Sequence, residues 1–234
     1  MNRPFSVEQI FISLVKILPF LGVTLRVVLG TVILGFALAI LVVRQKLSKN
    51  KFWNAFADTY IHILRCTPSI VLLFIVFYGI PKFVLVVFGI NINFWPKILF
   101  VVIALSLLYS AQMAEIIRSA LQAVGSGQYE AALSIGLSPF AAMTRIVIPQ
   151  AFVVALPNLG NSLIALLKEG SLAYTIGLID VMGKGNLIIS LNYGSYALET
   201  YIALAAVYWS FTLILENLFK LLEKHFSKGR VNVA

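Results

Sequence analysis

Charged side chains are scarce in this chain of 234 residues: 18 Lys and Arg plus 9 Asp and Glu make 27, or 12%, whereas 60% of the residues are hydrophobic. An average soluble domain carries about twice that share of charge. The charges are also clustered, and five runs of sixteen or more residues contain none: 27–43, 66–81, 98–114, 146–167 and 200–215. Such runs exclude a soluble enzyme and predict an integral membrane protein.

Cysteine and histidine are nearly absent as well. With one cysteine, Cys66, and two histidines, the sequence offers neither an internal disulfide framework nor a cluster with metal-ligand spacing. A phosphate-binding P-loop is also missing. Its nearest approach has five residues between Gly177 and Gly183 where the motif has four, and it ends in Gly185 where Ser or Thr should stand. We therefore expect this chain to be no enzyme, to hold no metal and no cofactor, and to leave ATP to another subunit.

The uncharged runs are long enough, with their ends and tilt included, to form helices of the ~17 to 25 mostly apolar residues that cross a bilayer. The sequence predicts an all-α integral membrane protein, with residues 1–234 as one transmembrane domain. Five transmembrane helices are expected at residues 21–43, 59–81, 97–119, 148–170 and 197–219. Residues 1–20 predict an interfacial helix. Residues 83–96 predict an outer loop, and the glycine-rich residues 171–196 predict helix fragments and loop at the outer face.

Lys and Arg expected outside the membrane predict the orientation, because positive charge collects in cytoplasmic segments. With the amino terminus outside and the carboxyl terminus inside, ten of these residues are cytoplasmic: Arg44, Lys46, Lys49, Lys51, Arg118, Arg145, Lys220, Lys224, Lys228 and Arg230. Five are outside: Arg3, Lys16, Lys82, Lys97 and Lys184. The remaining Arg26, Arg65 and Lys168 fall in or at the edge of a span, where an unpaired cation is costly, and are functional candidates unless they snorkel to the interface.

Polar residues on two spans predict a path for a polar solute, because polar groups that face lipid are costly. On the fourth span Asn158, Asn161, Ser162 and Glu169 share one helical face, and a shorter stripe lies on the third span. Such stripes also join helices through hydrogen bonds, so the pattern leaves both roles open. The candidates for the path are Arg65, Thr67, Ser106, Tyr109, Ser110, Met113, Glu115, Asn158, Asn161, Ser162, Lys168 and Glu169.

The segment between the third and fourth spans predicts a helix, a turn and a second helix. Ser126 or Gly127 is expected to cap the first helix, and Gly136 to end it in the left-handed conformation. Ser138 is expected to cap the second helix, with Pro139 at its first position.

The second helix of this segment would carry an apolar ridge of Phe140, Met143 and Val147 at helical spacing, before Pro149 marks the return to the membrane. Either a partner protein or the chain's own membrane domain would cover that ridge. Periodicity alone leaves the two alternatives open.

Several motifs carry a family resemblance. Glu130-Ala131-Ala132, followed by Gly136, Ile146 and Pro149, resembles the EAA loop in the membrane subunits of prokaryotic ABC importers. Four further motifs resemble the polar amino acid permeases of that superfamily: Arg65-Cys-Thr-Pro68, Ala114-Glu-Ile-Ile-Arg118, Gly127-Gln128-Tyr129 and Lys168-Glu-Gly-Ser-Leu172. The resemblance as a whole covers residues 20–220. The Gly177–Lys184 stretch resembles cystine-type members.

The chain departs from this family pattern at three places. Ile148 stands where the family usually has Leu, Ser110 where Ala is common, and Glu169-Gly170 where Asp-Thr is common. The last change keeps the acidic group but removes a hydroxyl near the expected path. The resemblance therefore supports the fold of this chain more directly than it supports the substrate of typical members.

The resemblance implies a type I ABC importer transmembrane fold and a permease that carries a polar amino acid, with L-cystine as one substrate, across a prokaryotic cell membrane. Its coupling loop would contact a separate ATPase, which binds ATP and Mg, through Glu130, Ala131, Ala132, Gly136, Phe140, Ile146 and Pro149. The implied partners are two ATPase copies, a second or homologous permease, an extracytoplasmic amino-acid-binding protein and the lipid bilayer, with no nucleic acid. The alternative is a secondary transporter or channel-type subunit that works without ATP, although five spans are too few for an inverted pair of repeats.

Overall fold

Helices dominate the structure, a computed structural model that describes residues 4–226. Arg3, Lys228 and Arg230, which enter the orientation prediction, lie outside these described residues. Five helical segments are long and apolar enough to cross a membrane: Val7–Lys46, Ser69–Phe88, Lys97–Ala123, Pro139–Ile176 and Ala197–Phe226. The prediction of an all-α protein with five spans is therefore confirmed.

The first span begins with an additional helix that packs on the last one. Helix α1 (Val7–Ile17) runs through a short 3₁₀ turn, η1 (Leu18–Phe20), into α2 (Leu21–Lys46), and it lies against α11 (Ala197–Phe226). The Ser13 Oγ lies 3.2 Å from the Thr200 Oγ1, and the Ser6 backbone N–H donates to the Glu199 carboxylate at 3.2 Å. The helix expected within residues 1–20 is present, and these polar contacts hold it to the end of the chain's last helix.

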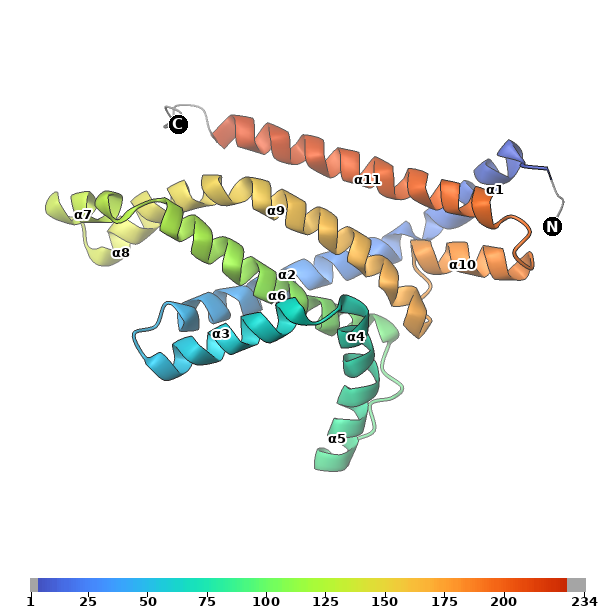
Figure 1. The fold of residues 1–234 in the computed structure, drawn as a ribbon, viewed down its shortest axis with the longest axis horizontal. Helices are drawn as coiled ribbons and strands as arrows, with labels where there is room; N and C mark the ends of the chain where they lie inside the picture. The colour runs from blue at the N-terminus through green and yellow to red at the C-terminus, as the bar shows by residue number, and fades with distance from the viewer. Residues whose placement is uncertain (1–3, 227–234) are drawn as a thin grey trace.

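The second span differs from the prediction of residues 59–81. Helix α3 (Lys51–Cys66) ends before Thr67. The span itself, Ser69–Phe88, consists of α4 (Ser69–Phe74), a π-helical turn η2 (Ile75–Gly79) and α5 (Ile80–Phe88). Pro68 disfavours a helical conformation at the residue before it, and Thr67 is indeed extended, with φ −91° and ψ 124°. The α4–α5 segment turns away from the other helices (Figure 1). Because α5 reaches Phe88, the loop expected over 83–96 begins only at Gly89, whose φ is +68°.

Close helix contacts form the core of the bundle. Helix α2 packs along α6 (Lys97–Ala123), which also contacts α9 (Ile148–Gly170), while α11 lies against α9. Glycine permits the closest approaches: a Cβ on Gly35 would come within 2.9 Å of the Tyr109 ring, and one on Gly160 within 2.8 Å of the Phe219 ring. Small residues at such contacts are typical of membrane helices, whose association depends on packing rather than on exclusion of water.

The short helices lie at opposite ends of the bundle. Helices α7 (Ser126–Ser134) and α8 (Pro139–Ala142), followed by the π-helical turn η3 (Met143–Val147), join α6 to α9 at one end. The 3₁₀ helix η4 (Ser171–Ile176) and α10 (Val181–Leu191) lie at the other end, near α1 (Figure 1). These are the helix fragments expected over 171–196. The two ends therefore offer different surfaces to whatever lies on either side of a membrane.

Candidate functional site

A left-handed turn joins the two short helices of the α7–α8 loop, defined here as residues 125–147. Gly136 has φ +88°; its backbone N–H donates to the Leu133 carbonyl at 2.9 Å, and that of Leu137 donates to the Ala132 carbonyl at 3.2 Å. These two bonds form a Schellman motif, which satisfies the last carbonyls of α7. A Cβ at position 136 would meet no atom within 4 Å, so only the backbone conformation requires glycine there.

The caps of the two loop helices match the prediction at one helix and contradict it at the other. The Ser138 Oγ accepts from the Ala141 N–H at 3.2 Å, with Pro139 at the first position of α8, as predicted. At α7 the capping residue is Gly125, with φ +74° and no side-chain cap, so the assignment of Ser126 or Gly127 is wrong. The chain turns into the helix through a conformation that suits glycine, which starts α7 at Ser126 itself.

The tip of the loop presents apolar side chains. Phe140 is 78% exposed and Met143 is 38% exposed, whereas Val147 is buried, so the predicted ridge is divided between the outside and the interior. Ile135, which the helical periodicity of the loop does not indicate, is 79% exposed beside the turn. Its position just before Gly136 marks it as a turn residue, but the sequence does not show the direction in which the turn points its side chain. We call Ile135 and Phe140 the loop tip.

The other predicted loop residues surround this tip. Glu130, Ala131 and Pro149 are exposed, Ile146 is half-buried and Ala132 is buried. The exposed carboxylate of Glu130 places a negative charge on the same helix that ends in the apolar tip. The loop thus combines a charge and large apolar groups, the mixture from which protein interfaces are built.

The base of the loop is packed tightly against the membrane helices. Ala120 at the end of α6 clusters with Ala151 and Ala155 at the start of α9, and their small side chains bring the two helices close together. The Gln150 amide donates to the Gln128 side chain at 3.3 Å and so links α9 to α7. Packed side chains and this hydrogen bond therefore join the loop to α6 and α9.

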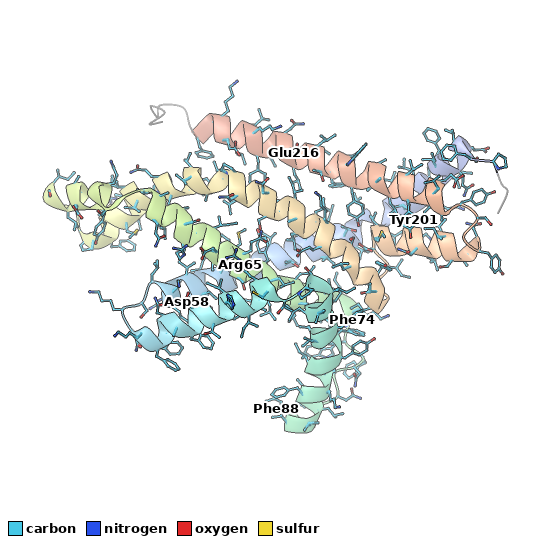
Figure 2. All side chains as sticks on the ribbon, in the orientation of Figure 1. Asp58, Arg65, Phe74, Phe88, Tyr201 and Glu216 are labelled. Carbon is cyan, nitrogen blue, oxygen red and sulfur yellow. The ribbon has the colours of Figure 1, made fainter. Side chains whose placement is uncertain are left out.

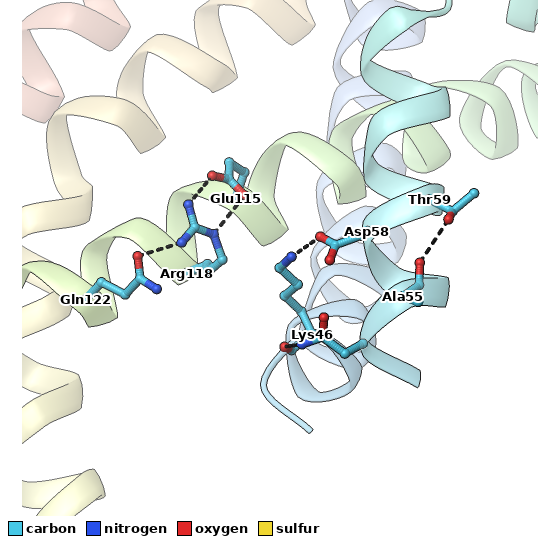
Figure 3. Close-up of polar contacts among 8 residues, drawn as sticks. Lys46, Ala55, Asp58, Thr59, Glu115, Arg118 and Gln122 are labelled. Atoms are coloured by element: carbon cyan, nitrogen blue, oxygen red, sulfur yellow. Dashed lines mark hydrogen bonds and ion pairs between the residues drawn. The ribbon is translucent and has the colours of Figure 1, made fainter. Parts of the chain in front are cut away.

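A charged pocket lies where α2, α3 and α6 meet. It has a volume of about 530 Å³ and is lined by Lys46, Asp58, Ile61, His62, Arg65, Cys66, Glu115 and Arg118. Figure 3 shows its two ion pairs, Lys46 with Asp58 between α2 and α3, and Arg118 with Glu115 along α6. Three cations face two carboxylates in this pocket, so one positive charge is left over.

Arg65 is the lining cation outside these two pairs. It is exposed near the end of α3, on the same helix as Asp58 (Figure 2). One residue beyond Cys66, the Thr67 hydroxyl donates to the Ile63 carbonyl at 2.7 Å and closes the end of the helix. The pocket thus brings together two predicted path residues, Arg65 and Glu115, whereas Thr67 serves the helix end.

The polar stripe predicted on the fourth span is divided in the structure. Asn158, Asn161 and Lys168 are exposed on α9, whereas Ser162 is buried at 1% exposure. Glu169 is half-buried and lies beside the Ser69 hydroxyl at the start of α4. An exposed polar face on a membrane-spanning helix requires water or protein beside it, because lipid cannot satisfy amide and ammonium groups.

The stripe on the third span is buried within the bundle. Ser106, Tyr109, Ser110 and Met113 are all buried in the described chain. The Ser106 Oγ donates to the Thr31 carbonyl of α2 at 3.4 Å, and the Ser110 Oγ lies 2.7 Å from the Tyr60 Oη of α3. In this arrangement the stripe joins α6 to α2 and α3, and the polar face of α9 is the one that remains open.

Asp180 joins α10 to α2 at the end of the bundle opposite the α7–α8 loop. Its carboxylate is 1% exposed, accepts from the Gly183 N–H at 2.8 Å as the cap of α10, and accepts from the Thr24 hydroxyl of α2 at 3.3 Å. The Val181 N–H donates back to the Thr24 Oγ1 at 3.3 Å. Burial raises the pKa of the Asp180 carboxyl, while its hydrogen bonds to Gly183 and Thr24 oppose that rise.

Replacement of Asp180 by alanine is expected to lower stability by about 0.5 to 2 kcal/mol, because the cap of α10 is lost. Asparagine caps about as well as aspartate, so Asp180→Asn should stay close to wild type in a thermal unfolding scan. The raised pKa of Asp180 adds a pH effect, because the folded protein holds the carboxyl proton more tightly than the unfolded chain does. As pH rises through the pKa of the folded state, that proton is lost and wild-type stability should fall. Asp180→Asn should lack that fall; equal Tm values for Ala and Asn variants would contradict the capping role.

Comparisons with known proteins agree with this geometry. Residues 31–228 match a family described as "Binding-protein-dependent transport system inner membrane component". The L-cystine transport system permease protein TcyL of Bacillus subtilis is 37% identical over 233 residues, 100% of this chain and 96% of that protein. A probable amino-acid permease protein of the same organism, YxeN, is 37% identical and covers 93% of each chain. A crystal structure of an amino acid ABC transporter with histidines superposes with a TM-score of 0.81 at 35% identity, covering 96% of this chain and 100% of the other.

Proposed function

Because this chain belongs to the family of binding-protein-dependent transport system inner membrane components, we propose that it forms the translocation path of an ATP-driven amino acid importer. It is a multi-pass membrane permease subunit of the amino acid ABC type, a class that is not itself an enzyme. The ATP and Mg of the cycle belong to a separate ATPase in this proposal. The predicted partners are two copies of that ATPase, a second permease and an extracytoplasmic amino-acid-binding protein.

The loop tip carries the proposal of an ATPase partner. Ile135 and Phe140, at 79% and 78% exposure, stand on a segment whose turn, caps and packed base leave little freedom. Large apolar groups held rigidly in water gain from burial in another protein, with about 25 cal/mol for each Å² removed from water. Glu130 would set the orientation of the contact by charge. With this end of the bundle on the cytoplasmic side, the amino terminus lies outside and the carboxyl terminus inside.

The polar face of α9 supports a path shared with a second permease. Asn158, Asn161 and Lys168 are exposed in the single chain, and lipid is an unfavourable neighbour for all three. A second copy that faces α9 would enclose these groups around a water-filled path. The face ends at Glu169, beside Ser69, the first residue of α4, where the second span begins after Pro68.

The side chains along this route fit a zwitterionic solute. Lys168 supplies a cation for a carboxylate and Glu169 an anion for an ammonium group, while Arg65 offers a second cation in the separate pocket between α2, α3 and α6. The full-length match to a protein named as an L-cystine permease makes a polar amino acid, with L-cystine as the first one to test, our proposed substrate. Cystine carries two ammonium and two carboxylate groups, which would pair with charges of both signs.

The decisive experiment is uptake by vesicles that contain this chain, a cognate ATPase and the companion binding protein loaded with labelled L-cystine or another amino acid. Uptake should require ATP and all three proteins. Transport by this chain alone without nucleotide would instead support the secondary-transporter or channel alternative. Failure to co-purify with any ATPase would overturn the importer proposal.

The same assay tests the turn of the loop with two matched glycines. Gly136→Val places a side chain in the left-handed region, which costs about 1 to 2 kcal/mol and misplaces α8, so uptake should fall strongly while insertion is kept. Gly127 lies in α7, has equally open space around its Cβ position and keeps an ordinary helical conformation, so Gly127→Val should transport nearly as well as wild type. Wild-type uptake by Gly136→Val at wild-type abundance would remove this turn from the mechanism.

A further inference from the structure

The turn between α2 and α3 gathers positive charge where the first candidate span ends. Residues 44–57 contain four cations and no acidic residue. Lys46 pairs with Asp58, whereas Arg44, Lys49 and Lys51 are exposed and have no ion pair among the described residues. Three positive charges are therefore uncompensated at the level where a span leaves the membrane.

A small pocket lies beside these cations. It has a volume of about 350 Å³ and is lined by Leu41, Arg44, Gln45, Ser48 and Trp53. Leu41, Arg44, Gln45 and Ser48 follow one another at helical spacing along one face at the end of α2. Trp53 of α3 completes the lining of the pocket. A guanidinium, an amide and a hydroxyl are hydrogen-bond donors suited to phosphate oxygens, and the planar guanidinium can bind two of them at once.

Aromatic rings form an apolar shelf next to the pocket. Phe52 and Trp53 meet edge to face with ring centroids 5.5 Å apart, and Trp53 and Phe56 do so at 6.3 Å. The three side chains are 69%, 45% and 53% exposed. Tryptophan is enriched at the membrane–water interface, where its ring lies among acyl chains and its N–H among headgroups. Rings directly beside uncompensated cations match a molecule that is both anionic and apolar.

We propose that this turn binds the headgroup of an anionic phospholipid. The phosphate lies against Arg44, Ser48 and the ammonium groups of Lys49 and Lys51, while the acyl chains cover Phe52, Trp53 and Phe56. Charge complementarity selects an anionic lipid over a zwitterionic one, and the exposed rings select a lipid over a free phosphate. The inference requires only that the turn lies at a membrane surface, so it stands apart from the proposed transport function.

Trp53 reports on this site directly. In full-length protein carrying Trp95→Phe and Trp209→Phe, Trp53 is the remaining tryptophan. In phosphatidylcholine nanodiscs with a minor share of brominated lipid, brominated phosphatidylglycerol should quench Trp53 more than brominated phosphatidylcholine does. Each basic residue near the surface adds about fivefold to the attraction of anionic lipid, so Arg44→Gln with Lys49→Gln and Lys51→Gln should remove the preference.

A matched variant keeps the net charge change but moves it elsewhere. Lys16→Gln with Lys82→Gln and Lys224→Gln removes three exposed lysines far along the chain from the turn and should retain the preference. Raised salt should weaken it in the wild-type protein, a measurement that needs no variant to fold.

Three results would overturn the proposal. Equal quenching by the two lipids in the wild-type protein would show no selection of charge. Release of brominated phosphatidylglycerol by inorganic phosphate would identify a site for a soluble anion. Absence of quenching by either lipid would show that a protein surface, such as a partner subunit or a second copy, covers the turn.

Discussion

Aspartate at both Ile135 and Phe140 is expected to abolish binding of the partner ATPase and, with it, ATP-dependent uptake. Each side chain is nearly four-fifths exposed on a loop with a rigid turn, so each is placed to enter a pocket of another protein. Loss of one buried interface anchor typically costs about 2 kcal/mol or more, which is roughly thirtyfold in affinity. A carboxylate buried in place of an apolar anchor costs more, because its charge is desolvated without a partner.

The measurement is co-purification of a tagged ATPase with the permease, followed by uptake in vesicles. The matched control is Ser134→Asp, which adds a negative charge at the exposed residue next to Ile135 but keeps both apolar side chains of the tip. The control should retain most binding, and the double variant should lose it at unchanged abundance in the membrane. If the double variant binds the ATPase as well as the control does, the loop tip is not the docking surface.

The number and type of helices follow from the sequence because charge is absent from the spans and concentrated between them. The fourth span is the clearest case: α9 is Ile148–Gly170, as predicted, because Arg145 and Pro149 mark one end and Lys168 the other. The second span was misplaced because an uncharged run does not show where a helix breaks. Pro68 carried that information, since Thr67 before it is held extended.

The functional residues were predicted less completely than the helices. Helical spacing shows which residues share one face of a helix, but not which other helix packs against that face. Asn158 and Ser162 stand four residues apart, yet Asn158 is exposed and Ser162 is buried, so helical spacing does not show which part of α9 a neighbouring helix covers. The exposure of Ile135 depends in the same way on the direction in which the chain leaves the Gly136 turn. Such directions are properties of the packed bundle rather than of any single segment.

Replacement of Glu169 by glutamine is expected to reduce amino acid uptake by roughly tenfold to a hundredfold. The half-buried carboxylate ends the open polar face of α9, beside Ser69, and lies where a substrate ammonium group would need a negative charge. A hydrogen bond to a charged group contributes about 1.5 to 3 kcal/mol, and the amide keeps the shape but not the charge. Glu169→Asp should recover part of the transport, because the charge returns on a shorter side chain.

A second buried carboxylate, Glu199, provides the control that distinguishes loss of substrate recognition from general damage to the fold. Glu199 is also largely buried, but it faces α1 and accepts from the Ser6 N–H, away from the polar face of α9. Glu199→Gln should therefore transport at close to the wild-type rate, while Glu169→Gln should bind the ATPase normally and yet fail in uptake. Equal uptake by wild type and Glu169→Gln would show that the carboxylate does not meet the substrate, and the recognition of the ammonium group would then belong to another part of the path.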